Sequence, residues 1–493
     1  MKRVLIANRG EISVRIARTL RELGVEAFAV HTAEDARALH VQRADRALAL
    51  RSPRGYLDGE EIIAQARAAG CDAIHPGYGF LSENAEFAAA CVTAGLSFIG
   101  PPPGAIAAMG SKQRARAAMA AAGVPITPGG DARTLYEAQQ TAARVGYPIL
   151  IKATDGGGGK GMRLVHSEAE LEAALERTRS EAKNAFGSDA VYIEKAITHA
   201  RHVEIQVLGD QHGNIVHLFE RDCSIQRRHQ KIVEETPCPA LRPETLAEMG
   251  EVAVRGAASI GYFSAGTFEF LLAPNGEFYF LEMNTRLQVE HPITEWVTGL
   301  DLVREMVQIA RGEPLGFEQA QRRGAAIEVR VYAEDPASGF LPSPGKISGL
   351  LPASGPFVRD DSGVYEGATV SASYDPMLSK LSVWAEDRER ALARMRRALG
   401  DYVVSGIRTN LAFLARVIAH PDFARGEYDI DFVGAKLNEL LAEPELDEDG
   451  RFLVAAAAAL AAQIEGEQRR AVPEPASSGI SPWVRAERSN LRW

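Results

Sequence analysis

The sequence predicts an α/β protein built from several domains, and three observations support this prediction. Short apolar strands alternate with amphipathic helices in the N-terminal part of the chain. A glycine-rich loop then lies between two further strands, and a region with many strands and turns begins at about residue 325. A length of 493 residues suggests roughly three domains, with ample material for a core.

The N-terminal part alternates regularly between strand and helix patterns. Strands are expected at Val4–Ala7, Val25–His31 and Ala73–His75, and helices at Ile12–Leu23 and Glu86–Ala94. Strands that alternate with helices form a parallel sheet with helices on both faces. No G-x-G-x-x-G sequence follows the first strand, so a nicotinamide cofactor is not supported.

The next region is expected to form a small α+β unit at about residues 125–197. Helices are expected at Lys112–Ala122 and Ala169–Ala185, and strands at Tyr147–Thr154, Met162–Val165, Tyr192–Lys195 and His202–Leu208. The glycine-rich loop at residues 155–161 connects the first two of these strands, and a strand rather than a helix follows it. It is therefore not a Walker A loop.

Two interpretations of the glycine-rich loop remain open. Its glycines allow the backbone to approach a phosphate closely, with N–H groups as donors. A flap that folds over nucleotide phosphates, with Lys112 and Lys152 supplying positive charge, fits this pattern. A flexible tight turn with two ordinary surface lysines fits it equally well.

A β-hairpin is expected further along the chain. Thr267–Leu272 and Glu277–Met283 are predicted strands, joined around Ala-Pro-Asn-Gly at residues 273–276. This hairpin places Glu269 and Glu282 on one face, opposite or diagonal to each other. Because like charges in such positions repel, a hard divalent cation between them would turn the repulsion into ligation. The sequence therefore suggests a magnesium site, and a solvated polar face is the alternative.

Polar side chains recur at every second position after the hairpin. If the segment is extended, one face carries Glu282, Asn284, Arg286, Gln288 and Glu290. The intervening apolar residues would face a core. An arginine and a third carboxylate would then lie on the same ribbon as the metal site.

Two further segments contain charged residues whose spacing suggests an anion pocket in one and an ion pair in the other. Residues 226–231, Gln-Arg-Arg-His-Gln-Lys, are strongly basic but contain no aromatic residue. A pocket for small anions therefore fits them better than nucleic-acid binding, although a solvated loop remains an alternative. In the predicted strand Ala326–Tyr332, Glu328 and Arg330 share one face, for which a cross-strand ion pair is the preferred interpretation.

Composition narrows the class of protein. The formal net charge is -10, which argues against a nucleic-acid partner. Four scattered cysteines without a C-x-x-C pair indicate reduced thiols in a cytoplasm, and a strand pattern at the N-terminus argues against a signal peptide. The alanine-rich run Phe452–Ile464 is too short to span a membrane and favours a packed helix, and Pro473–Pro482 has the composition of a linker.

Long strings in this chain resemble biotin carboxylase, a family within the ATP-grasp superfamily. They comprise residues 6–11 (IANRGE), 75–84 (HPGYGFLSEN), 156–162 (GGGGKGM), 221–231 (RDCSIQRRHQK), 282–292 (EMNTRLQVEHP) and 340–346 (FLPSPGK). The similarity extends from residue 1 to about residue 440 in the order of the family. The resemblance implies a Rossmann-like N-terminal domain at 1–111, an ATP-grasp domain at 112–324 with a mobile glycine-rich lid at about 125–197, a mainly β C-terminal domain at 325–442, and a helical and linker tail at 443–493.

The resemblance also implies a reaction and roles for individual residues. ATP would activate bicarbonate as carboxyphosphate, and the carboxyl group would pass to the ureido nitrogen of biotin. Glu290 would take the bicarbonate proton, and Arg330 would stabilise the enolate oxygen of biotin. The residues implied to act in catalysis or to hold bicarbonate and biotin are Tyr78, Lys231, Arg286, Gln288, Val289, Glu290 and Arg330.

The remaining implied residues hold the nucleotide and the metal. ATP would be bound by Lys112, Lys152, Gly157, Gly158, Gly159, Glu194, Lys195, Ile197, His202, Gln226, His229, Leu271 and Ile407. Mg²⁺ or Mn²⁺ would be bound by Glu269, Glu282 and Asn284.

The expected partners are proteins rather than nucleic acid or membrane. No Met-Lys-Met biotinylation sequence is present, so biotin is expected on a separate carrier protein, with carboxyltransferase subunits as further partners. For the tail, a segment that docks a partner subunit and a locally folded or frayed end fit equally well. A cytoplasmic homodimer is expected from the resemblance. Two alternatives stay open: another ATP-grasp ligase that forms an acyl phosphate, and a non-catalytic chain that kept the fold.

Overall fold

The computed structural model of the protein describes residues 1–153, 162–187, 189–442 and 448–470. The central glycines Gly157, Gly158 and Gly159 and the predicted linker at 473–482 lie outside the described residues. The described chain divides into two units, Met1–Leu441 and Ala442–Trp493.

The N-terminal region is the predicted parallel sheet. Its strands follow the order β3-β2-β1-β4-β5, and every neighbouring pair is parallel. The strands are β1 (Arg3–Ile6), β2 (Glu26–His31), β3 (Arg46–Ala49), β4 (Ala73–His75) and β5 (Ser97–Phe98). The helices are α1 (Gly10–Glu22), α2 (Leu39–Arg43), α3 (Gly59–Ala68), α4 (Ala85–Thr93) and α5 (Pro103–Met109), with a short 3-10 helix at Gly55–Leu57.

Both faces of this sheet are covered, as predicted. Val4 and Ile6 of β1 pack into a core that includes residues of α1, whereas Leu5 lies in a second core with residues of α3 and α4. A strand buried on both faces is continuously apolar, which explains the uninterrupted Val-Leu-Ile sequence of β1.

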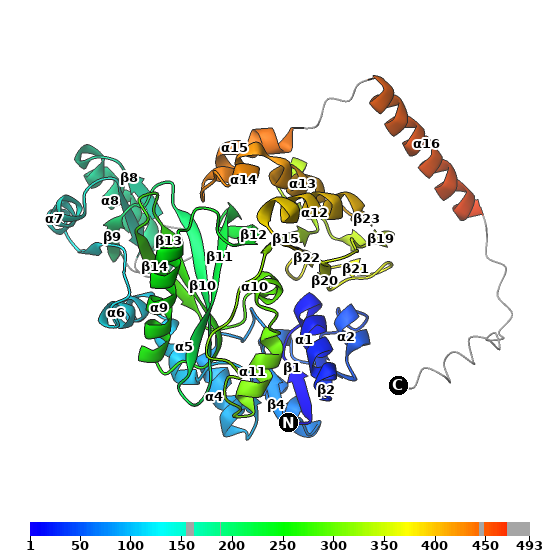
Figure 1. The fold of residues 1–493 in the computed structure, drawn as a ribbon, viewed down its shortest axis with the longest axis horizontal. Coiled ribbons are helices and arrows are strands. Elements are labelled where there is room, and N and C mark those ends of the chain that lie inside the picture. The colour runs from blue at the N-terminus through cyan, green and yellow to red at the C-terminus, as the bar shows by residue number, and fades with distance from the viewer. Residues whose placement is uncertain (154–161, 188, 443–447, 471–493) are drawn as a thin grey trace. The chain divides into compact units, whose positions relative to one another are not determined.

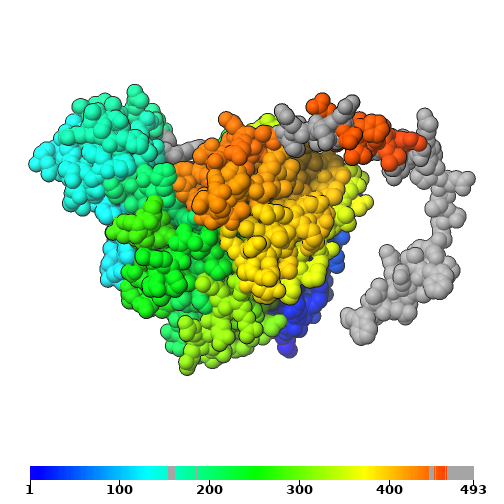
Figure 2. Space-filling view, turned by 45° about the horizontal axis from the view of Figure 1, so that its top comes forward, coloured from blue at the N-terminus to red at the C-terminus, as the bar shows by residue number. Residues whose placement is uncertain are grey.

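The lid region forms a separate small sheet with two helices packed on it. The strand order is β6-β9-β7-β8, and all neighbours are antiparallel. The elements are β6 (Gly129–Ala132), α7 (Leu135–Val145), β7 (Ile149–Ala153), β8 (Met162–Val165), α8 (Glu168–Phe186) and β9 (Val191–Lys195). A capping box at Thr134 and Glu137 starts α7. In Figure 2 this lobe, in cyan, stands out from the green body of the molecule.

The largest sheet has eight strands in the order β14-β13-β10-β11-β12-β15-β22-β20, with every neighbouring pair antiparallel. Its strands are β10 (Arg201–Gly209), β11 (Ile215–Arg227), β12 (Gln230–Thr236), β13 (Ser264–Leu272), β14 (Phe278–Asn284), β15 (Ala325–Tyr332), β20 (Val358–Ser362) and β22 (Met377–Ala385). The helices in this part of the chain are α6 (Lys112–Ala121), α9 (Pro243–Ser259), α10 (His291–Thr298) and α11 (Leu302–Ala310). Figure 1 shows β10–β14 in green between the lid and the C-terminal region.

The C-terminal region contains the predicted strands, which pair in antiparallel fashion, and helices pack on them. The helices are α12 (Arg388–Asp401), α13 (Leu411–Ala419), α14 (Pro421–Arg425) and α15 (Phe432–Leu441), with a 3-10 helix at Pro336–Ser338. The small strands are β16 (Glu334–Asp335), β17 (Leu341–Pro342), β18 (Gly345–Lys346), β19 (Gly349–Leu351), β21 (Thr369–Val370) and β23 (Val403–Ser405). Because β15 pairs with β12, the sheet runs without a break from the ATP-grasp region into the C-terminal region.

The second unit contains the predicted alanine-rich helix, α16 (Glu448–Arg470). Its apolar side chains Phe452, Leu453, Val454 and Leu460 are all exposed in the structure. The expectation of a packed helix is therefore not met within this unit. Among the described helices, none combines the length and the apolar character needed to cross a bilayer.

Candidate active site

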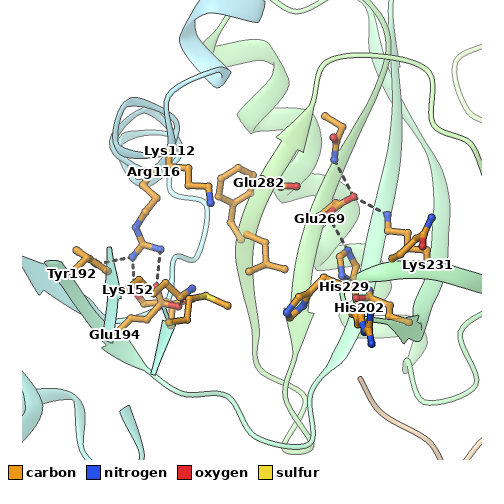
Figure 3. Close-up of a pocket in the computed structure, with 18 of the residues that line it drawn as sticks. Lys112, Arg116, Lys152, Tyr192, Glu194, His202, His229, Lys231, Glu269 and Glu282 are labelled. Atoms are coloured by element: carbon orange, nitrogen blue, oxygen red, sulfur yellow. Dashed lines mark hydrogen bonds and ion pairs between the residues drawn. The ribbon is translucent and has the colours of Figure 1, made fainter. Parts of the chain in front are cut away.

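A cavity of about 920 Å³ lies between the lid sheet, helix α6 and the large sheet. Most residues singled out from the sequence line it. These are Lys112, Lys152, Glu194, His202, Gln226, His229, Lys231, Glu269, Glu282, Asn284, Arg286, Gln288, Val289 and Arg330. Figure 3 shows its two sides, with Lys152 and Glu194 on the lid strands and Lys231 and His202 on the large sheet.

The predicted hairpin is formed by β13 and β14, and it places two carboxylates side by side. Its turn is closed by hydrogen bonds from Ala273 N to Glu277 O (2.8 Å) and from Gly276 N to Ala273 O (2.9 Å). Glu269 and Glu282 are directly opposite partners in the ladder, as predicted. Figure 3 shows Glu282 between the lid residues and Glu269.

The electrostatics of this pair fit a divalent cation. Burial raises the pKa of Glu282 above its ordinary value, and the negative charge of Glu269 raises it further. Asn284, the third predicted ligand, donates from Nδ2 to Glu269 Oε1 at 2.9 Å. Two carboxylates and an amide oxygen form a donor set that a hard cation such as Mg²⁺ prefers, so the residues present fit this ion.

Glu269 is held by Lys231 and His202. Lys231 Nζ lies 2.7 Å from Glu269 Oε1, and His202 Nε2 lies 3.0 Å from Oε2. Burial alone would favour the protonated acid, but Lys231 and His202 hold the pKa of Glu269 below its ordinary value. The carboxylate is therefore ionised and ready to act as a ligand.

The extended ribbon predicted for residues 282–290 is wrong in its second half. Strand β14 ends at Asn284, and Glu290 is the N-cap residue of α10. Pro292 lies in the first turn of α10, where its fixed φ favours a helix start and ends the extended pattern. Leu287 is fully buried beneath this irregular segment. The alternating pattern of the segment therefore reflects a buried loop whose polar side chains Asn284, Arg286 and Gln288 face the cavity.

Glu290 does not itself line the cavity: its carboxylate is fully buried, and its partners Lys231 and Arg330 line the cavity. Its two oxygens accept hydrogen bonds from Lys231 Nζ (2.8 Å) and Arg330 Nη2 (3.0 Å). Burial opposes the charged form, but Lys231, Arg330 and Arg221 together hold the pKa of Glu290 well below its ordinary value. The side chain is therefore an ionised group beside two cations, with no exposed surface.

Arg330 fits both the cross-strand ion pair expected from its strand pattern and the active-site position implied by the resemblance. It forms an ion pair with Glu234 on the neighbouring strand β12, at 2.6 Å, and it also lines the cavity. Burial raises the pKa of Glu234 to about 7, although Arg330 opposes this shift. Arg330 is therefore held by a second carboxylate besides Glu290.

Glu204 is a functional candidate that the sequence reasoning missed. Its carboxylate is fully buried and pairs with Lys231 Nζ at 2.6 Å and with the guanidinium of Arg221. Lys231 therefore contacts three carboxylates, those of Glu204, Glu269 and Glu290. On β10, Glu204 is the direct partner of Glu269, a pairing that a known β10–β13 register would have revealed.

Arg286 is oriented by contacts on all sides. Its Nε donates to Glu83 at 2.9 Å, Nη1 to Gln288 Oε1 at 3.0 Å, and Nη2 to Asn284 Oδ1 at 2.9 Å. Glu83 belongs to the N-terminal region and was not singled out from the sequence. These contacts fix the guanidinium beside Glu269 and Glu282, the two proposed metal ligands, where it can act as an anion-binding group.

The basic segment at residues 226–231 is a hairpin turn rather than a loop. It joins β11 to β12, with positive φ angles of 50° at Arg228 and 67° at His229. Gln226 lies 2.9 Å from His202 Nδ1, which links the turn to the residues around Glu269. The arrangement agrees with the predicted anion pocket, because Arg228, His229 and Lys231 all line the cavity.

The lid side of the cavity carries a compact ionic cluster. Lys152 on β7 forms an ion pair with Glu194 on β9. Arg116 on α6 lies 3.8 Å from Glu194 and stacks over the ring of Tyr192 at 5.0 Å. Arg116 and Tyr192 were not predicted, since a lone arginine on a helix carries no sequence signal.

Six predicted residues among those described do not line the cavity, namely Glu290 and the following five. Lys195 donates to the carbonyl oxygens at 146 and 147, Ile197 is half-buried, and Leu271 lies opposite His202 in the β10–β13 ladder. Tyr78 packs against the N-terminal core. Ile407 follows β23 and packs on the core that includes residues of β15 and β22.

Three family profiles match consecutive parts of the chain. The biotin carboxylase N-terminal domain matches residues 1–106, the carbamoyl-phosphate synthase L chain ATP-binding domain matches 111–318, and the biotin carboxylase C-terminal domain matches 328–435.

Similar proteins cover almost the whole chain. Methylcrotonoyl-CoA carboxylase subunit alpha of Dictyostelium discoideum is 46% identical over 98% of this chain and 69% of its own length. Biotin carboxylase of Nostoc is 50% identical over 87% of this chain and 98% of its own length. The chain belongs to the biotin carboxylase family. It is accordingly a ligase whose reaction is the ATP-dependent carboxylation of biotin.

A solved structure supports the same membership. The biotin carboxylase domain dimer of Hydrogenobacter thermophilus 2-oxoglutarate carboxylase, in complex with MgADP, ADP and bicarbonate, has a TM-score of 0.84 and 42% identity, covering 90% of this chain and 99% of that one.

Proposed function

We propose that Glu290 is the base that takes the proton of bicarbonate, and that the cavity holds MgATP and bicarbonate together. The observation that carries the proposal is the buried, ionised Glu290 carboxylate between Lys231 and Arg330. Proton transfer to Glu290 leaves a carbonate oxygen free to attack the γ-phosphorus. The bond between the β- and γ-phosphates breaks, and carboxyphosphate and ADP form.

The second step transfers the carboxyl group to biotin. Carboxyphosphate breaks at its C–O bond into CO₂ and phosphate, and the phosphate takes the proton of the ureido nitrogen. That nitrogen then attacks CO₂. Arg330 would stabilise the negative charge that develops on the ureido oxygen, a role supported by its position on the cavity wall with a buried guanidinium.

The other cavity residues divide between anion, nucleotide and metal. Lys231, Arg286 and the Gln288–Val289 segment would hold bicarbonate. Lys112, Lys152, His202, Gln226, His229 and the glycine loop would hold ATP, with Glu194, Lys195, Ile197 and Leu271 near its adenine end. Glu269, Glu282 and Asn284 would hold Mg²⁺, which neutralises phosphate charge when bound.

We propose that biotin arrives on a separate carrier protein, that carboxyltransferase subunits complete a multisubunit carboxylase in the cytoplasm, and that this chain forms a homodimer. The dimer of the Hydrogenobacter thermophilus domain supports the last point. The tail after residue 442 would contact a partner subunit.

An assay of ATP cleavage with and without bicarbonate and free biotin tests the proposal. We expect cleavage that depends on bicarbonate and carboxybiotin that appears only with biotin. An acyl-phosphate ligase acting on another carboxylate would ignore both compounds, and a non-catalytic chain would cleave nothing.

The variant Arg330→Ala separates the two steps. It should bind ATP as the native protein does and lose about 10²–10³-fold in biotin carboxylation, as expected for one oxyanion donor. Equal rates of carboxybiotin formation in the two proteins would contradict the role of Arg330.

A further inference from the structure

A second buried lysine lies behind the cavity rather than in it. The side chain of Lys380, on β22, has no exposed surface. Its Nζ donates a hydrogen bond of 2.8 Å to the main-chain oxygen of Val289. Val289 belongs to the segment proposed to hold bicarbonate, and its carbonyl is joined directly to Glu290.

Lys380 also contacts the N-terminal region. Its Nζ lies 3.4 Å from Glu11 Oε2, on the first turn of α1, and 5.7 Å from the centre of the Tyr78 ring. Both oxygens of this buried carboxyl group lack a hydrogen-bond partner within the described residues, and Glu11 forms its ion pair there with Lys380. One ammonium group therefore connects three parts of the molecule.

The neighbouring carbonyl is held in a similar way. His291 is fully buried, and its Nδ1 lies 2.8 Å from the oxygen of Gln288. The carbonyls of Gln288 and Val289 thus each have a side-chain donor beneath the irregular segment. This segment has no strand partner of its own, because β14 ends at Asn284.

We propose that Lys380 is a positioning residue that fixes the backbone of Val289, and through it the bicarbonate-binding segment and Glu290. The proposal rests on the function proposed above for Gln288, Val289 and Glu290. Burying an ammonium group costs free energy, and an apolar side chain of similar length would avoid that cost. The hydrogen bond to the Val289 oxygen gives the lysine a task that such a side chain could not perform.

The variant Lys380→Met tests the proposal because it keeps the length of the side chain and removes the donor. We expect the KM for bicarbonate in ATP cleavage to rise by about tenfold or more, the effect of losing one charge-assisted hydrogen bond. The KM for MgATP should stay as in the native protein, because the residues described in contact with the Lys380 ammonium group are Val289, Glu11 and Tyr78, none of them proposed to bind the nucleotide. A purely structural role would change both KM values together or neither.

A double variant separates positioning from charge balance. Lys380→Met alone leaves Glu11 buried without a counter-ion, and this can lower stability or prevent folding. Combining it with Glu11→Gln removes both charges and should restore the thermal unfolding temperature, while the KM for bicarbonate stays high. Recovery of the native KM in the double variant would overturn the proposal.

Glu328→Gln is the matched control. Glu328 lies on β15, is fully buried, and is among the groups that interact electrostatically with Lys380, but its carboxylate makes no hydrogen bond among the described residues. We expect its KM for bicarbonate to match that of the native protein. A rise equal to that of Lys380→Met would show a general response to changes in this core and would overturn the proposal. If the native protein itself shows no bicarbonate-dependent cleavage, the proposed function fails instead.

Discussion

At the scale of single residues, the proposed chemistry depends on Glu290. The variant Glu290→Gln should retain ATP binding and lose most bicarbonate-dependent turnover, by about 10²–10⁴-fold, the usual contribution of a positioned base. The amide keeps one oxygen as an acceptor, and Lys231 still has Glu204 and Glu269 as partners, so the fold should persist. Nucleotide titration and steady-state cleavage rates measure the two effects. Turnover close to the native rate would remove Glu290 from the role of base.

Glu11 makes the free energy of unfolding depend on pH. Burial raises its pKa from 4.5 to about 7, with Asp361 adding to this shift and Lys380 and Arg359 opposing it. The folded protein therefore keeps this proton over a range in which the unfolded chain releases it, and the free energy of unfolding falls as the pH rises from about 4.5 to about 7. Glu11→Gln should remove about 1–3 kcal/mol of that decline, measured by urea unfolding at both ends of the range. The same decline in both proteins would contradict this expectation.

At the scale of elements, the β13–β14 hairpin provides the two carboxylates of the proposed metal site. Glu282→Gln should raise the Mg²⁺ concentration needed for half-maximal ATP cleavage, because the ion loses one of its two carboxylate ligands. Glu277→Gln is the control, since Glu277 begins the same hairpin arm but is exposed and outside the cavity. A Mg²⁺ titration of the three proteins tests the site. An unchanged Mg²⁺ requirement in Glu282→Gln would argue against metal binding by this carboxylate.

The hairpin could be predicted because its information is local. The Pro-Asn-Gly turn signals the hairpin, and the ladder beside it pairs Phe270 with Phe280. An irregularity between Glu269 and Phe270 then shifts the register by one residue and brings Glu269 opposite Glu282, a detail that the turn alone does not predict. The ribbon beyond it could not be predicted in the same way, because a period of two persists in a buried loop as well as in a strand. Only Pro292, at the start of α10, signalled the end of the extended segment.

At the scale of the whole molecule, the site depends on strand pairing between distant parts of the sequence. The sequence suggested a separate region after about residue 325, but β15 pairs with β12 and continues the large sheet. This pairing brings Arg330 to Glu234, and the next strand brings Lys380 opposite Arg330. Contacts across almost a hundred residues, such as Arg330–Glu234, have no local signature, so neither Glu234 nor Lys380 could be assigned from the sequence.

The division into two units predicts that residues 1–442 suffice for the chemistry. Every described residue that lines the cavity lies in the first unit, and Leu440 and Leu441 pack against its core. The similarity to the biotin carboxylase of Nostoc spans 438 residues and covers 98% of that protein. In Nostoc, a chain of about this length is therefore a biotin carboxylase. A variant ending at residue 442 should therefore keep the native KM values, turnover with free biotin and thermal unfolding temperature. Co-purification of the full and shortened chains with carrier and carboxyltransferase subunits then tests the proposed docking role of the tail. Loss of turnover with free biotin in the shortened chain would instead place part of the active site beyond residue 442.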